Sequence, residues 1–230
     1  MQKNDELNKR DSSSAVQRNS GQLGFLYSLP GILLAVSVYS VIHVLARLIA
    51  SGNLGDDDPT DNLFIQVFSA GYSTDTGPLY NWVLWVLQHW MGTGINAFQT
   101  LKYFLLVVMA GFLFLATRRL TGSGLWGVLS VEALALTYQI AWRFHEVYTH
   151  RVGAMTLAIM TVWGVLNLLE SRKWHNYLLL GIFIGLGLLT EHTYAVFLFS
   201  LLVALMVRTT IRSRIFSPWL FSLYLSSGLY

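Results

Sequence analysis

The sequence predicts an all-α fold, a polytopic bundle of transmembrane helices. Of its 230 residues, 54% are hydrophobic and only 12% are charged, which is about half the charged fraction of roughly 25% found in soluble domains. The charged residues collect in short clusters, and long apolar runs separate these clusters. Several runs approach the roughly 20 apolar residues that a helix needs to cross the hydrocarbon core of a bilayer. Lipid is therefore the expected solvent of most of the chain.

The polar amino-terminal region, residues 1–22, is expected to form a disordered cytoplasmic tail ahead of a transmembrane domain at 23–230. The first apolar run, at 26–49, follows this long tail and is long enough to cross the membrane. It is therefore expected to be a signal anchor and not a cleaved signal peptide. The absence of cysteine excludes disulfides, thiolate metal sites and cysteine nucleophiles. The net charge of +3 is small and scattered, which argues against nucleic acid as a partner.

The later apolar runs predict further helices. Three of them are long enough to cross the membrane, at about 98–117, 124–142 and 152–169. The segment 79–91 is apolar and rich in tryptophan, but it is short for crossing, so we expect it to lie in the membrane surface. The apolar run at 177–207 is interrupted at Glu191-His192, which favours two short antiparallel helices joined by a polar turn. Glycines within this run predict close helix packing, at Gly181, Gly185 and Gly187.

The basic residues test this layout, because Lys and Arg mark cytoplasmic loops. They gather in four clusters: the amino-terminal tail, Arg118-Arg119, Arg172-Lys173 and the group Arg208, Arg212 and Arg214. All four clusters fall on one side only if the segment 79–91 does not cross. The opposite side then collects the acidic loop at 51–76, the loop at 143–151 and the turn at Glu191-His192.

The acidic loop after the first predicted span contains Asp56, Asp57, Asp58 and Asp61. Adjacent carboxylates repel one another, which raises the pKa of at least one of them and suits a general base or a cation site. A solvated loop with a simple turn at Asp58-Pro59 would explain the same residues without any chemistry. The residue types alone leave both interpretations open.

A second polar cluster follows the predicted span at 124–142. It comprises Arg143, His145, Glu146, His150 and Arg151. His145 and Glu146 suit a metal ion or a proton relay, and the arginines suit a phosphate. An ordinary interfacial loop, whose charged groups reach the membrane surface, is the alternative.

Isolated ionisable residues form the third group of candidates. Ionisable groups at membrane depth are costly and commonly functional, which draws attention to Glu191 and His192, although a solvated turn would also explain them. Glu132 is predicted to lie in the middle of a span, where it is either functional or bonded to a neighbouring helix. Lys102 is expected close to the interface, where it either reaches the surface or meets a phosphate.

Four motifs resemble those of family 39-type glycosyltransferases, the bacterial relatives of protein O-mannosyltransferases. The run from Gly71-Tyr72 to Gly77-Pro78-Leu79-Tyr80-Asn81-Trp82 resembles the family segment that begins with Gly-Tyr and continues with Pro-Pro-Leu-Tyr-x-Trp-Leu. The other three follow in the family's order: Arg118-Arg119-Leu120, His145-Glu146-x-x-Thr149-His150, and the run from Gly185 to Thr190. The resemblance covers residues from about 30 to 207.

The resemblance implies a GT-C membrane glycosyltransferase of the bacterial inner membrane that modifies cell-envelope glycans or lipids. Such enzymes take a sugar from a polyprenyl-phosphate donor and transfer it to a lipid or glycan acceptor on the outer face. In the family an acidic residue of the first outer loop is the base. The matching residue here is Asp57, 14 residues before Gly71, with Asp58 beside it.

The resemblance also implies substrate-binding roles for residues of the other polar clusters. The departing lipid phosphate requires positive charge, which Lys102, Arg143 or Arg151 would supply. The remaining expected substrate-binding residues are His145, Glu146, His150, Glu191 and His192. A divalent metal ion is left open.

Three features depart from the family's pattern. Gly77-Pro78 stands where the family commonly has Pro-Pro, and Thr190-Glu191-His192 stands where it commonly has Ser-Lys-Tyr, which reverses a charge. Family members are also much longer, so this chain is expected to correspond to the amino-terminal part of such an enzyme. The alternative is a non-catalytic polytopic membrane protein, either a truncated remnant or a transporter component. A transporter would line a path through the membrane with polar groups, and Glu132 is the sole interior carboxylate predicted.

Overall fold

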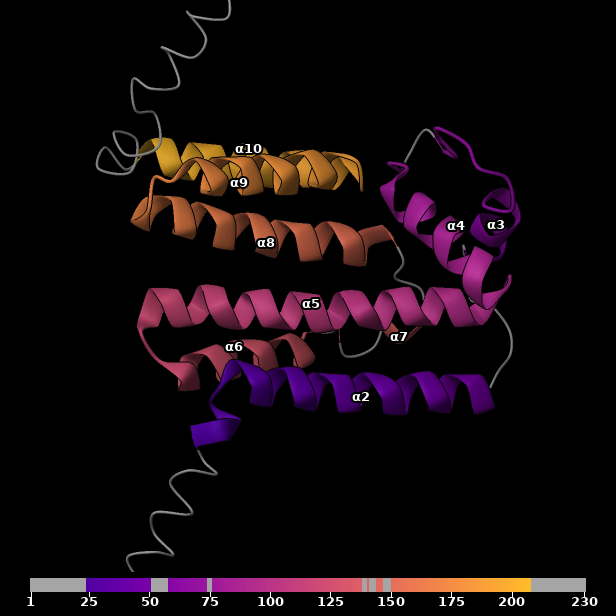
Figure 1. Cartoon of the computed structure of the whole chain (residues 1–230), viewed down its shortest axis with the longest axis horizontal. Coiled ribbons are helices and arrows are strands. Elements are labelled where there is room, and N and C mark those ends of the chain that lie inside the picture. Colours follow the sequence, from indigo (N-terminus) through magenta and orange to yellow (C-terminus); the bar gives the residue numbers. More distant parts are fainter. Residues whose placement is uncertain are drawn as a thin grey trace, which may run out of the picture.

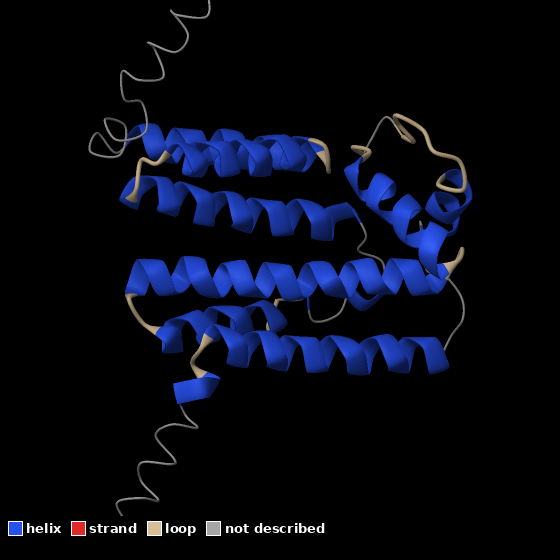
Figure 2. Cartoon of the chain, in the orientation of Figure 1, coloured by secondary structure: helices blue, strands red, loops and turns tan. Residues whose placement is uncertain are grey.

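A computed structural model describes residues 24–50, 58–73, 76–137, 140, 144–146 and 150–207. Within these residues the structure is a bundle of helices, and its β-structure is limited to one isolated bridge between Thr76 and Glu191 (Figure 2). The predicted all-α fold is confirmed. The predicted tail at 1–22 and the cluster at 208–214 lie outside the described residues.

Among the described residues, three helices are long and apolar enough to cross a membrane. They are α2 (Leu29–Ala50), α5 (Ile95–Thr121) and α8 (His150–Glu170), and they match the predicted spans at 26–49, 98–117 and 152–169. Helix α5 ends at Gly122, whose φ of 72° is left-handed and whose N–H donates to the Arg118 carbonyl. Glycine adopts this conformation without a steric penalty, so it is the usual residue just after a helix.

Three shorter apolar helices complete the bundle: α6 (Gly124–Ala135), α9 (Trp174–Leu188) and α10 (His192–Val207). Helices α9 and α10 contact each other and run in opposite directions (Figure 1), which confirms the predicted pair of short antiparallel helices. The predicted span at 124–142 is wrong as a single helix. Helix α6 ends at Ala135, where the N–H groups of Leu136 and Thr137 donate to carbonyls three residues earlier and tighten the last turn.

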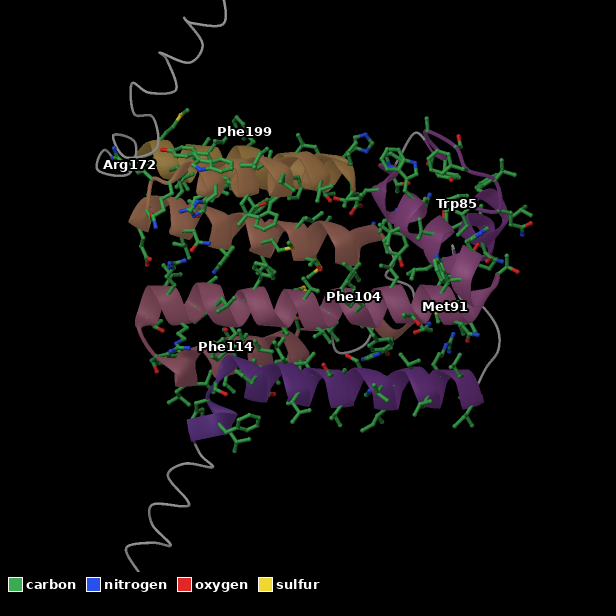
Figure 3. All side chains as sticks on the ribbon, in the orientation of Figure 1. Trp85, Met91, Phe104, Phe114, Arg172 and Phe199 are labelled. Atoms are coloured by element: carbon green, nitrogen blue, oxygen red, sulfur yellow. The ribbon has the colours of Figure 1, made fainter. Side chains whose placement is uncertain are left out.

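Helices α3 (Asp58–Phe64), α4 (Leu79–Met91) and α7 (Phe144–Glu146) gather at one end of the bundle (Figure 1). Helix α4 has the bounds of the segment predicted not to cross, and it lies beyond the ends of α8, α9 and α10. We call this end, which also contains the starts of α5 and α8 and the turn between α9 and α10, the α4 end. Arg118-Arg119 and Arg172-Lys173 lie at the opposite end, the basic end (Figures 1 and 3).

Helix α5 is the centre of the bundle and contacts α2, α4, α6 and α8. Its Phe114 is fully buried against Ile32 of α2 and Val131 of α6. Phe104 of α5 and Phe199 of α10 are instead 62% and 69% exposed, and Phe199 lies at the outer edge of the bundle (Figure 3). Large apolar side chains directed outward are expected where lipid is the solvent.

The glycines of α9 differ in their surroundings. A Cβ atom at Gly187 would lie 2.1 Å from Cζ of Tyr194, so this glycine allows α9 and α10 to pack closely. A Cβ at Gly181 or Gly185 would meet no described atom within 4 Å. The predicted close packing is therefore confirmed at Gly187 and wrong at the other two.

Candidate functional site

The polar residues predicted to share one side of the membrane come together at the α4 end. Six of the ten predicted site residues have described side chains: Lys102, His145, His150, Arg151, Glu191 and His192. Two others, Asp57 and Arg143, lie outside the described residues. Asp58 begins α3 and Glu146 ends α7, but their side chains are not among those described.

A carboxylate–imidazole pair joins α3 to α8. Nε2 of His150, the first residue of α8, lies 2.9 Å from Oδ2 of Asp61 in α3. The two side chains are only 10% and 17% exposed, and the His150 ring also packs against the ring of Tyr80 from α4, with centroids 4.8 Å apart. His150 therefore connects three helices, and it fixes α3 immediately after the acidic loop.

The pair also determines what His150 can do chemically. A carboxylate accepts a hydrogen bond, so in a neutral imidazole Nε2 bears the proton and Nδ1 is left as an acceptor. Nδ1 is buried and has no hydrogen-bond partner within the described part of the chain. A buried acceptor of this kind is suited to a water molecule or a substrate hydroxyl.

Asp61 was noted in the acidic loop of the sequence but was not predicted to be a site residue. Its partner is 89 residues away along the chain. No local pattern of residues signals that pairing, because it depends on how α3 docks against the start of α8.

A second polar cluster surrounds His145 in α7. Nε2 of His145 lies 2.8 Å from the Tyr39 hydroxyl, and Nδ1 lies 2.7 Å from the Tyr103 hydroxyl. The ring also stacks on that of His43, with centroids 4.7 Å apart. Both nitrogens of His145 are therefore engaged, which makes it a residue that organises its neighbours and leaves no lone pair for a metal ion.

The surroundings of His145 are positively charged. Burial, followed by the charges of His43 and Lys102, lowers the pKa of His145 from 6.5 to about 4, so the ring is neutral at pH 7. Lys102 is 1% exposed, and its Nζ lies 5.6 Å from the centroid of the Phe144 ring, within the range of a cation–π interaction. Of the two alternatives for Lys102, a side chain that reaches the surface is ruled out by this burial, and contact with a phosphate stays a prediction.

Two residues of this cluster, His43 and Arg47, were missed in the sequence. Together with Tyr39 they occur at intervals of four on α2, which places them on one face of that helix. His43 also lies 3.0 Å, through Nδ1, from the Tyr39 carbonyl, and Nε of Arg47 is buried without a hydrogen-bond partner among the described residues. A polar stripe in an otherwise apolar span was the available signal, because such residues are rare inside membranes and commonly functional.

Glu191, which reverses a charge relative to the family pattern, is paired with Arg151. Nε of Arg151 lies 3.5 Å from Oε1 of Glu191, and their side chains are 63% and 12% exposed. The Glu191 carboxylate is thus paired with the Arg151 guanidinium, which was predicted to bind a phosphate. His192 begins α10 with an exposed side chain.

A cavity of about 400 Å³ opens between α2, α5 and α6. Tyr39 and Glu132 provide its polar lining, and apolar side chains provide the rest. Tyr39 also belongs to the His145 cluster, so the cavity adjoins that cluster. In the part of the chain that the structure describes, no group of three His, Asp or Glu side chains is arranged to hold a metal ion.

Comparisons with known proteins support the motif-based resemblance. Residues 75–228, more than half of the chain, match the family described as dolichyl-phosphate-mannose-protein mannosyltransferase. The chain is also 27% identical over 184 residues to the lipopolysaccharide core galacturonosyltransferase RgtA of Rhizobium johnstonii. It is 27% identical over 191 residues to the galacturonosyltransferase RgtB of the same organism. The predicted resemblance is confirmed.

The two alignments each cover 80% of this chain, but only 36% and 37% of the relatives. The chain therefore spans little more than a third of the length of the curated relatives it matches. No solved structure matches the chain significantly.

Proposed function

This chain belongs to the dolichyl-phosphate-mannose-protein mannosyltransferase family, and we propose that it transfers a sugar from a polyprenyl-phosphate donor to a lipid or glycan acceptor of the bacterial cell envelope. The reaction takes place at the α4 end of the helix bundle. The observation that carries the proposal is that this end contains both α3, which directly follows Asp57 in the sequence and is held by the pair of Asp61 and His150, and the buried cation of Lys102. An inverting glycosyl transfer from a lipid phosphate requires a base and a positive charge.

Asp57 is the proposed base. It directly precedes α3 (Asp58–Phe64), and four residues later Asp61 is held by His150. In the proposed reaction the Asp57 carboxylate takes the proton of the acceptor hydroxyl as that oxygen attacks the anomeric carbon of the donor. The new glycosidic bond forms as the bond from the anomeric carbon to the phosphate oxygen breaks, and the configuration inverts. Asp58 beside it raises the basicity of the pair through repulsion between the carboxylates.

The surroundings of Lys102 are the proposed site of the donor phosphate. The leaving polyprenyl phosphate gains negative charge as the sugar departs, and preorganised cations stabilise that charge. Lys102, which is buried beside the Phe144 ring, supplies the positive charge. The apolar tail of the donor stays in the membrane beside the bundle, because extracting it would cost about 0.8 kcal/mol for each CH₂ group.

The proposed orientation places the basic end in the cytoplasm and the α4 end on the outer face of the inner membrane. Arg118-Arg119 and Arg172-Lys173 share the basic end (Figure 1), and such residues mark cytoplasmic loops. The names of the two relatives make galacturonic acid the first candidate sugar and a lipopolysaccharide core the first candidate acceptor.

Sugar transfer in membranes tests the proposal. Membranes containing the chain are supplied with radiolabelled polyprenyl-phosphate galacturonic acid and a lipopolysaccharide acceptor, and membranes without the chain are the control. We expect label in the acceptor fraction only when the chain is present, and a parallel assay with EDTA tests a divalent metal requirement. Failure to transfer galacturonic acid, mannose or aminoarabinose from such donors would favour the alternative of a non-catalytic membrane protein.

A further inference from the structure

Two segments that are far apart in the sequence pair through their main chains at the α4 end. The first is residues 76–79, at the entry to α4, and the second is residues 189–191, in the turn between α9 and α10. The Gly77 N–H donates to the Thr190 carbonyl and the Leu79 N–H donates to the Leu189 carbonyl, both at 3.0 Å. Thr76 and Glu191 form an antiparallel bridge. We call this pairing the clasp.

The clasp requires glycine at position 77. A Cβ atom there would lie 2.2 Å from the carbonyl oxygen and 2.5 Å from the carbonyl carbon of Leu189. These are backbone atoms, so no rotation of a side chain relieves the clash. Proline, which the family commonly has at this position, would add ring atoms and would also lack the N–H that bonds to Thr190.

The clasp brings together the two segments that depart from the family pattern. Gly77 is one departure, and the run from Thr190 to His192 is the other. They are more than 100 residues apart in the sequence, yet their main chains are hydrogen-bonded to each other. The clasp accounts for the glycine at position 77, which has an N–H and no Cβ. It does not account for the residue types at 190–192, because any residue supplies the main-chain carbonyls.

The α9–α10 turn, which forms one side of the clasp, is held in place by further contacts. Thr190 is 1% exposed and its hydroxyl donates to the Gly187 carbonyl at 2.6 Å. Glu191 pairs with Arg151 of α8. The turn is therefore fixed to the bundle, and it offers a firm surface to the segment that enters α4.

We propose that the clasp positions the loop before α4 against the bundle in the working state of the protein, and that Gly77 is the positioning residue on which it depends. The loop connects α3 to α4, so the clasp restrains its carboxyl-terminal end, while the pair of Asp61 and His150 restrains α3 at its amino-terminal end. The catalytic consequence rests on the proposed function, but the pairing itself does not. Helix α4 also packs against α5 through Tyr80 and Leu84, and it is expected to keep this packing when the clasp is lost.

Disulfide trapping tests the clasp directly, because the sequence contains no cysteine. The bridge has the hydrogen bonding of a non-hydrogen-bonded antiparallel pair, in which Cα atoms are about 4.5 Å apart, within the range of about 4.4–6.8 Å that disulfides accept. Thr76→Cys combined with Glu191→Cys is therefore expected to cross-link rapidly in membranes under mild oxidation. Thr76→Cys combined with Thr121→Cys, at the basic end, is the control that is expected not to cross-link.

The dependence on Gly77 is tested in the same double-cysteine background. Gly77→Ala and Gly77→Pro are expected to slow cross-linking about tenfold or more, as expected for the net loss of at least one hydrogen bond. Gly71→Ala, in the same loop, is the matched control, because a Cβ there meets no described atom within 4 Å. Its cross-linking rate is expected to equal that of the parent. Equal rates in the Gly77 variants, or slow cross-linking in the parent, would overturn the proposal.

Transfer activity then shows whether the clasp is closed during the reaction. Gly77→Ala in the cysteine-free parent is expected to lower sugar transfer, and transfer equal to that of the parent would contradict a working state with a closed clasp. If the unmodified chain transfers no sugar, the proposed function fails. The cross-linking rates would still decide whether the clasp forms.

Discussion

Breaking the pair of Asp61 and His150 is expected to destabilise the protein and to release α3 from the bundle. The side chains are 17% and 10% exposed, so the removal of either partner leaves the other largely buried and unsatisfied. The cost of an unsatisfied buried group is about 1–3 kcal/mol. In a protein of this size each kcal/mol lowers the melting temperature by about 2–4 °C.

A double-mutant cycle separates the pair from the rest of each side chain. Asp61→Ala, His150→Ala and the double variant are compared with the parent by thermal unfolding in detergent micelles. Loss of the Tyr80 packing by His150→Ala cancels in the cycle, so the coupling energy reports the pair, and we expect about 1 kcal/mol or more. The exposed pair of Arg119 and Glu170 is the matched control and is expected to couple more weakly.

Additive effects would refute the reasoning. If the double variant is destabilised by the sum of the single variants within about 0.5 kcal/mol, Asp61 and His150 do not interact in the folded protein. The anchoring of α3 by His150 would then be wrong.

Other features of the bundle lead to expectations of the same kind. Gly187→Ala places a methyl group against the Tyr194 ring and is expected to destabilise the α9–α10 pair by about 1–3 kcal/mol, whereas Gly181→Ala is expected to leave the melting temperature unchanged or higher; equal effects would contradict the packing described. Because the pKa of His145 is lowered to about 4, the unfolded chain binds an extra proton below pH 6.5. The stability that the neutral His145 ring contributes is therefore fully present above pH 6.5 and is lost as the pH falls toward 4. The melting temperature of His145→Gln should fall less steeply over this pH range than that of the parent. An equally steep fall in both proteins would refute this. Gly71→Cys should react with an impermeant maleimide from the outer face of the inner membrane, whereas a cysteine in the turn between α5 and α6 should not; the reverse pattern would invert the proposed orientation.

The helices were predictable from the sequence because their determinants are local. The length of the apolar runs identified α2, α5 and α8, and the short run after Pro78 gave the bounds of α4. The end of α6 was not predictable in this way, because the apolar residues continue past Ala135 while the helix does not. Composition reports which solvent a segment prefers and does not report where its backbone turns.

The site was predictable in its residue types and not in its contacts. His150 was a candidate because of its polar neighbours in the sequence, but its partner Asp61 depends on the docking of α3. For Lys102 the sequence left two alternatives, a side chain that reaches water and one that meets a phosphate, and the structure shows that only 1% of the residue is exposed. The main-chain pairing at Gly77 could not be predicted from the composition. The one signal in the sequence was that Gly77 departs from the family pattern.

Sugar transfer by the unmodified chain and by its Asp57→Asn variant, measured side by side in membranes with a labelled polyprenyl-phosphate donor, tests the central claim most directly. The substitution removes the proposed base and keeps the size of the side chain, and equal amounts of both proteins in the membrane are verified beforehand. We expect transfer by the unmodified chain and a loss of at least about 100-fold in the variant, the contribution that a positioned general base usually makes. Equal transfer by both proteins would contradict the assignment of Asp57, and no transfer by either would contradict the proposal that this chain is a glycosyltransferase.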